Sequence, residues 1–186
     1  MNTPLRALVV YESMFGNTET IARAVTDTLR LDGFAVEVHE VRDAPADAPG
    51  AVDLLVVGAP THAFSLSRPS TRADAVQQGA PAGRADRGLR EWLGTATGRA
   101  GLAVAVFDTR AAKARRLPMS GGRKAARLAR QRGFTLLGTP VGFVVEDLKG
   151  PLAAHETERA ARWAQSIAEV ARAHIAAERA ARDPSQ

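Results

Sequence analysis

The sequence predicts an α/β domain in which helices cover both faces of a parallel sheet. Three observations lead to this prediction. Short apolar segments alternate five times with segments whose apolar residues recur at helical spacing. Some of these apolar segments, such as DLLVVG at residues 53–58, have almost no polar interruption, which suits strands buried on both faces. The chain has 186 residues, the length of one domain with a single core.

In the first half of the chain, residues 5–11 form an apolar run that is long enough for a strand. Ile21, Val25 and Leu29 then follow helical spacing, and a glycine at position 33 can end that helix. Residues 34–41 alternate like a strand, residues 42–51 read as a loop rich in Pro and Asp, and residues 53–58 read as a buried strand.

The second half repeats the pattern after a long polar loop. A helical stripe at Leu89, Trp92 and Leu93 precedes a strand at residues 102–107, and a further helix is expected over residues 120–132. Residues 134–145 are strand-like, with a break expected at Pro140. A last helix follows. We expect one domain over residues 1–178 and a frayed tail over residues 179–186.

Composition excludes several kinds of chemistry. The chain has no cysteine, so disulfides, thiolate metal ligands and cysteine nucleophiles are excluded, and redox chemistry would have to come from a cofactor. The four histidines show no metal-binding spacing. No apolar run is long enough to cross a bilayer, and the first residues do not resemble a signal peptide. We therefore expect a cytoplasmic protein without a membrane partner.

The loop SMFGNT, at residues 13–18, joins the first strand to the first helix. Backbone N–H groups at a helix N-terminus attract phosphate, and Gly16 lets the backbone approach closely. Ser13, Asn17 and Thr18 add neutral donors. The loop lacks the lysine of a nucleotide-triphosphate loop and the spacing of the dinucleotide fingerprint. On spacing alone, an anion site and a plain strand-to-helix turn are equally well supported.

Two further loops follow strands of the same expected sheet. GAPTHAF, at residues 58–64, displays Thr61, His62 and Phe64 after a buried strand. An aromatic ligand suits such a surface, although an exposed loop histidine and a core phenylalanine are equally good interpretations. FDTR, at residues 107–110, ends at the start of a basic segment, which carries nine Arg and Lys residues and no acid from Arg110 to Arg132. Ligands of parallel sheets bind at the carboxyl ends of strands, where these loops meet.

The three loops together resemble those of flavodoxins. SMFGNT is similar to the loop that binds the FMN phosphate, GAPTHAF to the loop that flanks the flavin ring, and FDTR lies where the third loop belongs. The resemblance implies a doubly wound, flavodoxin-like fold with the strand order 2-1-3-4-5 that is known for flavodoxin, whose FMN lies at the switch point of the sheet. It also implies these FMN-binding residues: Ser13, Met14, Phe15, Gly16, Asn17, Thr18, Pro60, Thr61, His62, Ala63, Phe64, Phe107, Asp108, Thr109 and Arg110.

The resemblance implies an FMN-binding electron carrier that shuttles electrons between redox partners. Phe15 stands where the family usually has a hydroxyl residue, and the ring-flanking loops contain neither Trp nor Tyr. The alternatives are an FMN-dependent NAD(P)H or quinone oxidoreductase and a binding protein without flavin. The basic segment from Arg110 to Arg132 predicts docking to an acidic protein surface. It contains no aromatic residue to stack on bases, so a nucleic-acid partner is not expected.

Overall fold

The computed structural model describes residues 3–45 and 52–182 and contains a six-stranded parallel sheet. The strands are β1 (Arg6–Tyr11), β2 (Ala35–Glu40), β3 (Leu54–Pro60), β4 (Ala103–Ala111), β5 (Thr135–Leu136) and β6 (Val141–Val145). Their order is β2-β1-β3-β4-β5, and β6 also pairs with β4. The predicted flavodoxin-like fold class is confirmed.

The fifth position of the sheet is shared by two short strands. β5 pairs with β4 at Ala103 and Val104, and β6 pairs with the later part of β4, from Phe107 to Ala111. Pro140 lies between the two pieces, and a proline cannot donate a ladder hydrogen bond. The expected break in the strand-like segment 134–145 therefore separates β5 from β6.

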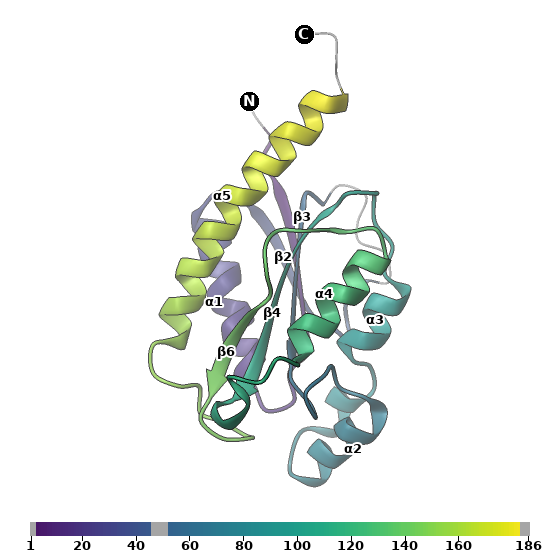
Figure 1. Cartoon of the computed structure of the whole chain (residues 1–186), viewed down its shortest axis with the longest axis vertical. Helices are drawn as coiled ribbons and strands as arrows, with labels where there is room; N and C mark the ends of the chain where they lie inside the picture. The colour runs from purple at the N-terminus through teal and green to yellow at the C-terminus, as the bar shows by residue number, and fades with distance from the viewer. Residues whose placement is uncertain (1–2, 46–51, 183–186) are drawn as a thin grey trace.

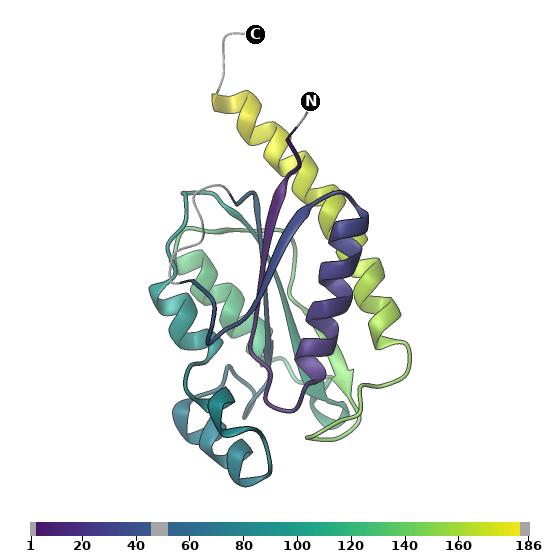
Figure 2. The same ribbon diagram turned by 180° about the vertical axis from the view of Figure 1, so that it is seen from behind.

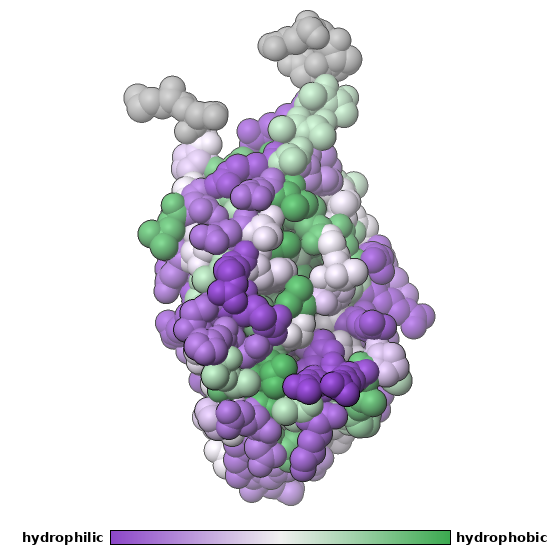
Figure 3. Space-filling model, turned by 60° about the vertical axis from the view of Figure 1, so that its left-hand side comes forward, coloured by the Kyte–Doolittle hydropathy of each residue, from purple (hydrophilic) through white to green (hydrophobic). Residues whose placement is uncertain are grey.

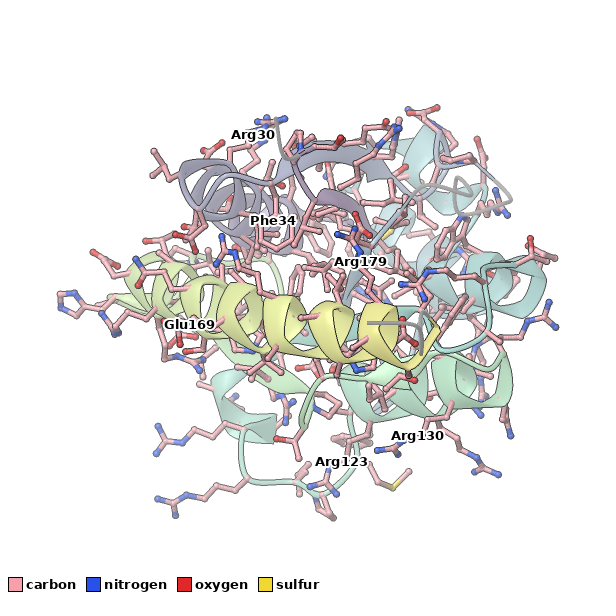
Figure 4. All side chains as sticks on the ribbon, turned by 90° about the horizontal axis from the view of Figure 1, so that it is seen from above. Arg30, Phe34, Arg123, Arg130, Glu169 and Arg179 are labelled. Atoms are coloured by element: carbon pink, nitrogen blue, oxygen red, sulfur yellow. The ribbon has the colours of Figure 1, made fainter. Side chains whose placement is uncertain are left out.

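Helices cover both faces of the sheet, as Figures 1 and 2 show from opposite sides. Helices α1 (Asn17–Leu31) and α5 (Glu156–Arg182) lie on one face, and α3 (Leu89–Thr95) and α4 (Gly121–Gln131) lie on the other. Each face has its own apolar cluster. Phe107 and Phe143 belong to the first, and Trp92 belongs to the second. Phe34 lies between α1 and α5, where the Arg172 guanidinium covers its ring at 5.1 Å (Figure 4).

The long polar loop expected after β3 contains a helix that the sequence did not reveal. Helix α2 (Pro69–Gln77) and a 3₁₀ turn, η1 (Ala82–Ala85), lie beyond the carboxyl ends of the strands. Only Arg72 and Ala75 of α2 are buried, so the helix has no apolar stripe to detect. A second 3₁₀ turn, η2 (Ala112–Ala114), follows β4.

The last helix runs further than expected. Residues 179–182, which the sequence assigned to the frayed tail, belong to α5, and residues 183–186 lie outside the described residues. Residues 46–51, the larger part of the loop expected after β2, also lie outside them. Figure 3 views the α1/α5 side, where hydrophilic side chains predominate and hydrophobic patches lie between them. None of the helices in residues 3–45 and 52–182 has both the length and the apolar content needed to span a membrane.

Candidate functional site

A hollow lies at the carboxyl edge of the sheet, where the loops after β1, β3, β4 and β6 meet helix α2. Eleven of the fifteen predicted residues line it: Ser13, Met14, Phe15, Asn17, Thr18, Pro60, Thr61, His62, Ala63, Thr109 and Arg110. The structure therefore brings all three predicted loops to one place. Gly16, Phe64, Phe107 and Asp108 do not line the hollow.

The first loop has the geometry of an anion site. Gly16 directly precedes α1 and has φ +92°, a conformation that glycine adopts without a steric penalty. The Ser13 hydroxyl oxygen accepts hydrogen bonds from the N–H groups of Gly16, at 3.1 Å, and Glu19, at 3.2 Å. Within the described chain, the N–H groups of Asn17 and Thr18 have no acceptor. These first-turn donors lie beside the hollow and suit a bound anion.

Arg84 of η1 holds the first loop and the first turn of α1 through two hydrogen bonds. Its guanidinium donates to the Ser13 carbonyl at 3.0 Å and to the Glu19 carboxylate at 2.9 Å. Arg23 also donates to Glu19, and these hydrogen bonds hold the pKa of that carboxyl below its usual range. The acidic charge in the first turn of α1 is thereby balanced by two cations.

Glu12, between β1 and the first loop, is fully buried. One of its carboxylate oxygens accepts a hydrogen bond from the Leu89 N–H at 2.8 Å, and the other has no hydrogen-bond partner. Burial raises the pKa of Glu12. The carboxyl group fixes the start of α3 to the base of the loop.

The second loop reverses direction immediately after His62. The backbones of His62 and Ser65 exchange two hydrogen bonds, of 2.8 and 3.0 Å, around Ala63 and Phe64. Ala63 and Phe64 have positive φ, 46° and 63°. This left-handed conformation is unfavourable for residues other than glycine and asparagine. His62 faces the hollow, and burial lowers its pKa, which favours the neutral imidazole. The Phe64 side chain is 48% exposed.

The N-terminus of α4 fixes the second and third loops. The Gly121 N–H donates to the Thr61 hydroxyl at 2.9 Å, and the Gly122 N–H donates to the Asp108 carboxylate at 2.8 Å. A Cβ atom at position 122 would lie 2.7 Å from that carboxylate, and one at position 121 would lie 3.1 Å from the Pro60 carbonyl oxygen. The two consecutive glycines therefore let the start of α4 approach the second and third loops closely.

Two residues expected at the flavin ring have other positions. Phe107 is fully buried on the α5 side of the sheet, with its ring centroid 5.9 Å from that of Phe143 and 5.8 Å from that of Trp163. A Cβ at Gly58, its register partner on β3, would lie 2.0 Å from the Phe107 ring. Phe107 is thus a core residue rather than a wall of the hollow.

Asp108 does not line the hollow either, but it holds a residue that does. Its buried carboxylate accepts two hydrogen bonds from the Arg110 guanidinium, at 2.7 and 2.8 Å, in addition to the one from Gly122. Arg110 does line the hollow, so Asp108 determines where that guanidinium lies. The Thr18 and Thr109 hydroxyls share a buried 2.8 Å hydrogen bond, which joins the first loop to the third.

Sequence reasoning missed two walls of the hollow. Helix α2 and the residue that follows it contribute Thr71, Asp74, Ala75 and Gln78, and the end of β6 with its following loop contributes Val145, Asp147 and Leu148. No motif marks these residues. The only available signal was topological, because a strand in the fifth position must also end at the ligand edge.

A second hollow adjoins the first through Arg110. Arg115, Arg116 and Arg123 line it together with Pro140, Gly142 and Val144. Those three arginines are exposed and have no acidic partner among the described residues. Figure 4 shows Arg123 and Arg130 on the side of α4 that faces away from the sheet. These three arginines of the basic segment therefore form an unneutralised surface next to the candidate site.

Comparisons with known proteins agree with this geometry. The flavodoxin family model matches residues 9–81, which contain the first two loops. A short-chain flavodoxin associated with a non-canonical PDU bacterial microcompartment superposes with TM-score 0.63 and 20% identity, over 90% of this chain and 99% of its own. A flavodoxin from the domain Archaea gives TM-score 0.62 and 18% identity, over 90% and 99%.

A flavodoxin described as WrbA-like, from Agrobacterium tumefaciens, gives TM-score 0.56 and 21% identity, over 91% of this chain and 99% of its own. At these identities the structures show a shared fold. No curated protein sequence matches the chain.

Proposed function

We propose that this chain, which belongs to the flavodoxin family, binds FMN and carries electrons between redox partners. The observation that supports this most strongly is the meeting of all three predicted loops at one hollow. The unpaired N–H groups of Asn17 and Thr18 fit a phosphate. The apolar and polar wall formed by Pro60, Thr61 and His62 fits a flat ring system.

In this arrangement the loop at residues 13–18 would hold the phosphate, and the second and third loops would flank the ring. Bound FMN would supply the redox chemistry, since it accepts and releases electrons singly or in pairs. The chain's own contribution is to orient the ring, exclude water from part of it and set its electrostatic surroundings. Arg110, held by Asp108, is a cation that lines this part of the hollow.

The direct test compares FMN with riboflavin, which lacks the phosphate. We expect the purified protein to be yellow, or to become so when FMN is added, and to bind FMN far more tightly than riboflavin. Equal affinities would remove the phosphate assignment. A colourless protein that ignores FMN would contradict the proposal and favour a flavin-free binding protein.

We propose an acidic protein as the electron-transfer partner. Arg115, Arg116 and Arg123 present unpaired positive charge beside the hollow. Three apolar residues on loops that border the two hollows are exposed: Phe64 (48%), Met119 (63%) and Leu148 (70%). An apolar rim with a cationic flank suits a transient partner of opposite charge, because such charge mainly accelerates encounter.

Stopped-flow electron transfer from the reduced protein to an acidic iron–sulfur protein tests this docking. Arg116→Gln should slow the second-order rate at low salt, and the difference should shrink as salt is raised. Arg162→Gln, an exposed arginine on α5, is the matched control. Equal effects of the two substitutions would show that the partner docks elsewhere.

The arginine hollow also favours a second candidate, an FMN-dependent NAD(P)H oxidoreductase. Arginines bind phosphate oxygens with paired N–H groups, and this hollow shares Arg110 with the candidate flavin site. Multiple-turnover oxidation of NADPH by the FMN-loaded protein, with a quinone acceptor, would establish this activity. Its absence, together with fast single-electron exchange, would leave the carrier function.

A further inference from the structure

The loop at residues 146–150 follows β6 and contacts the first loop, although β6 is not a neighbour of β1 in the sheet. β6 is separated from β1 by β3 and β4. The Glu146 N–H donates to the Pro151 carbonyl at 2.9 Å, so the loop is closed at its base. At its tip, the Asn17 side-chain amide donates to the Lys149 carbonyl at 3.0 Å. The backbone of Lys149 is therefore fixed next to the first turn of α1.

Close packing maintains this contact. Gly150 has φ +123°, and a Cβ atom there would lie 3.0 Å from the Asn17 amide oxygen. A side chain at this position would be strained and would also press on Asn17. The neighbouring Asp147 and Leu148 line the main hollow. The loop is thus a wall of the site rather than a remote surface feature.

The Lys149 ammonium group extends over the first loop. Its nitrogen lies 5.9 Å from the ring centroid of Phe15, the residue just before Gly16. Across residues 3–45 and 52–182, Lys149 has no acidic partner. Arg23 and Arg84, the other cations beside the loop, both bind Glu19. The positive charge of Lys149 is therefore available to a ligand.

We infer that Lys149 is a specificity residue that recognises the phosphate of the bound flavin by charge. This inference rests on the proposed FMN site. The SMFGNT loop supplies only neutral donors, whereas a phosphate monoester carries nearly two negative charges near neutral pH. A cation from the loop after β6 balances part of that charge, with the α1 dipole acting from the other side. The negative charge of Asp147, which lines the same hollow, opposes part of this attraction, whereas the Asn17 contact holds the Lys149 backbone beside the first turn of α1.

The test measures FMN and riboflavin dissociation constants for the wild type, Lys149→Gln and Lys149→Arg. Glutamine leaves the backbone contact with Asn17 intact and removes the charge. We expect Lys149→Gln to weaken FMN binding about tenfold at low salt and to leave riboflavin binding unchanged. The FMN effect should shrink as ionic strength rises, and Lys149→Arg should restore most of the affinity. Arg162→Gln, at an exposed position on α5 that lines neither hollow, also removes one positive charge and should have no effect.

The outcomes separate this inference from the function on which it rests. A wild type that binds neither flavin would remove the FMN proposal itself. If the wild type prefers FMN and Lys149→Gln keeps the full preference, the phosphate site stands and the role of Lys149 is overturned. Equal losses for FMN and riboflavin would also overturn it, because they would show that the loop only shapes the wall of the hollow.

Discussion

The two ends of the candidate site are built in different ways. At the end proposed to bind phosphate, Ser13, Gly16 and the first turn of α1 lie within a few residues of one another, and most contacts are local. At the end proposed to bind the ring, Thr61 and Asp108 are held by Gly121 and Gly122, from a helix that begins after a further 3₁₀ turn. A local motif can therefore reveal the first end but not the second.

Electrostatics differ between the two ends as well. Glu19, the acid in the first turn of α1, is neutralised by two arginines. Its charge therefore does not cancel that of Lys149 near the first loop. At the ring end, Arg110 is neutralised by the buried Asp108. The arginines without an acidic partner line the adjoining second hollow. Under the proposed function, Arg110 would help to position the ring, and Arg115 and Arg116 would be the charges left for a partner.

The largest expected effect comes from removing Asp108. Asp108→Ala deletes the acceptor for Gly122 and leaves the half-buried Arg110 without its partner. Breaking a buried pair typically costs about 3–5 kcal/mol, so we expect the free energy of unfolding to fall by about 3 kcal/mol in urea titrations. FMN and riboflavin affinities should fall together, because the ring end is affected.

The control for this change is Asp43→Ala, which breaks the exposed Arg42–Asp43 pair. Exposed pairs contribute about 0–1 kcal/mol, so this variant should remain close to the wild type. A loss of FMN affinity in Asp108→Ala without any loss of riboflavin affinity would mean that the two ends of the site are not separable in this way.

Thr18→Val tests the phosphate end. It removes a buried hydroxyl that bonds to Thr109 and lines the hollow. Loss of a hydrogen bond to a charged group typically costs about 1.5–3 kcal/mol, which corresponds to at least a tenfold weaker FMN affinity in fluorescence titrations. Riboflavin affinity should change much less. Thr157→Val, at an exposed position on α5 outside the hollow, should leave both affinities unchanged.

The sequence predicted the parts whose determinants are local. The apolar strands, the alternation with helices and the first loop all follow from residues that are near one another. Helix α2 was missed because it buries only Arg72 and Ala75 and has no apolar stripe. The contribution of Lys149 was missed because it depends on where the loop after β6 ends, which no motif near position 149 indicates.

Phe107 illustrates a second limit. As the last apolar residue before a polar loop, it is equally compatible with the core and with a ring contact. Only its register with Gly58, whose missing side chain leaves room for the Phe107 ring, decides that it belongs to the core. Such cross-strand complementarity has no signature within either strand alone.

A smaller effect is expected from the turn at the ring end. Ala63 has φ 46°, and a left-handed conformation costs a non-glycine residue about 1–2 kcal/mol. Ala63→Gly removes that strain but makes the unfolded chain more flexible. We expect a net gain of about 0.5 kcal/mol in the free energy of unfolding. Ala154→Gly, at an exposed position outside the positive-φ residues, should instead lose stability. If both variants lose stability equally, the turn is not strained.

The smallest effect concerns the pH dependence of His62, which burial makes harder to protonate. Its pKa in the folded protein lies below the ordinary value of about 6.5, so the unfolded state binds more protons in the range just below that value. Stability therefore rises with pH there and is lost as pH falls from about 7 toward 5. The unfolding free energy of His62→Gln should lack this part of the pH dependence. The variant should therefore gain stability relative to the wild type as the pH falls from about 7.5 to about 5. His155→Gln, which makes the same substitution at a side chain that is 84% exposed, is the matched control. An NMR titration of the His62 imidazole with a midpoint at or above about 6.5 would show that the second loop leaves this side chain in water, and the ring end would then be more open than its contacts indicate.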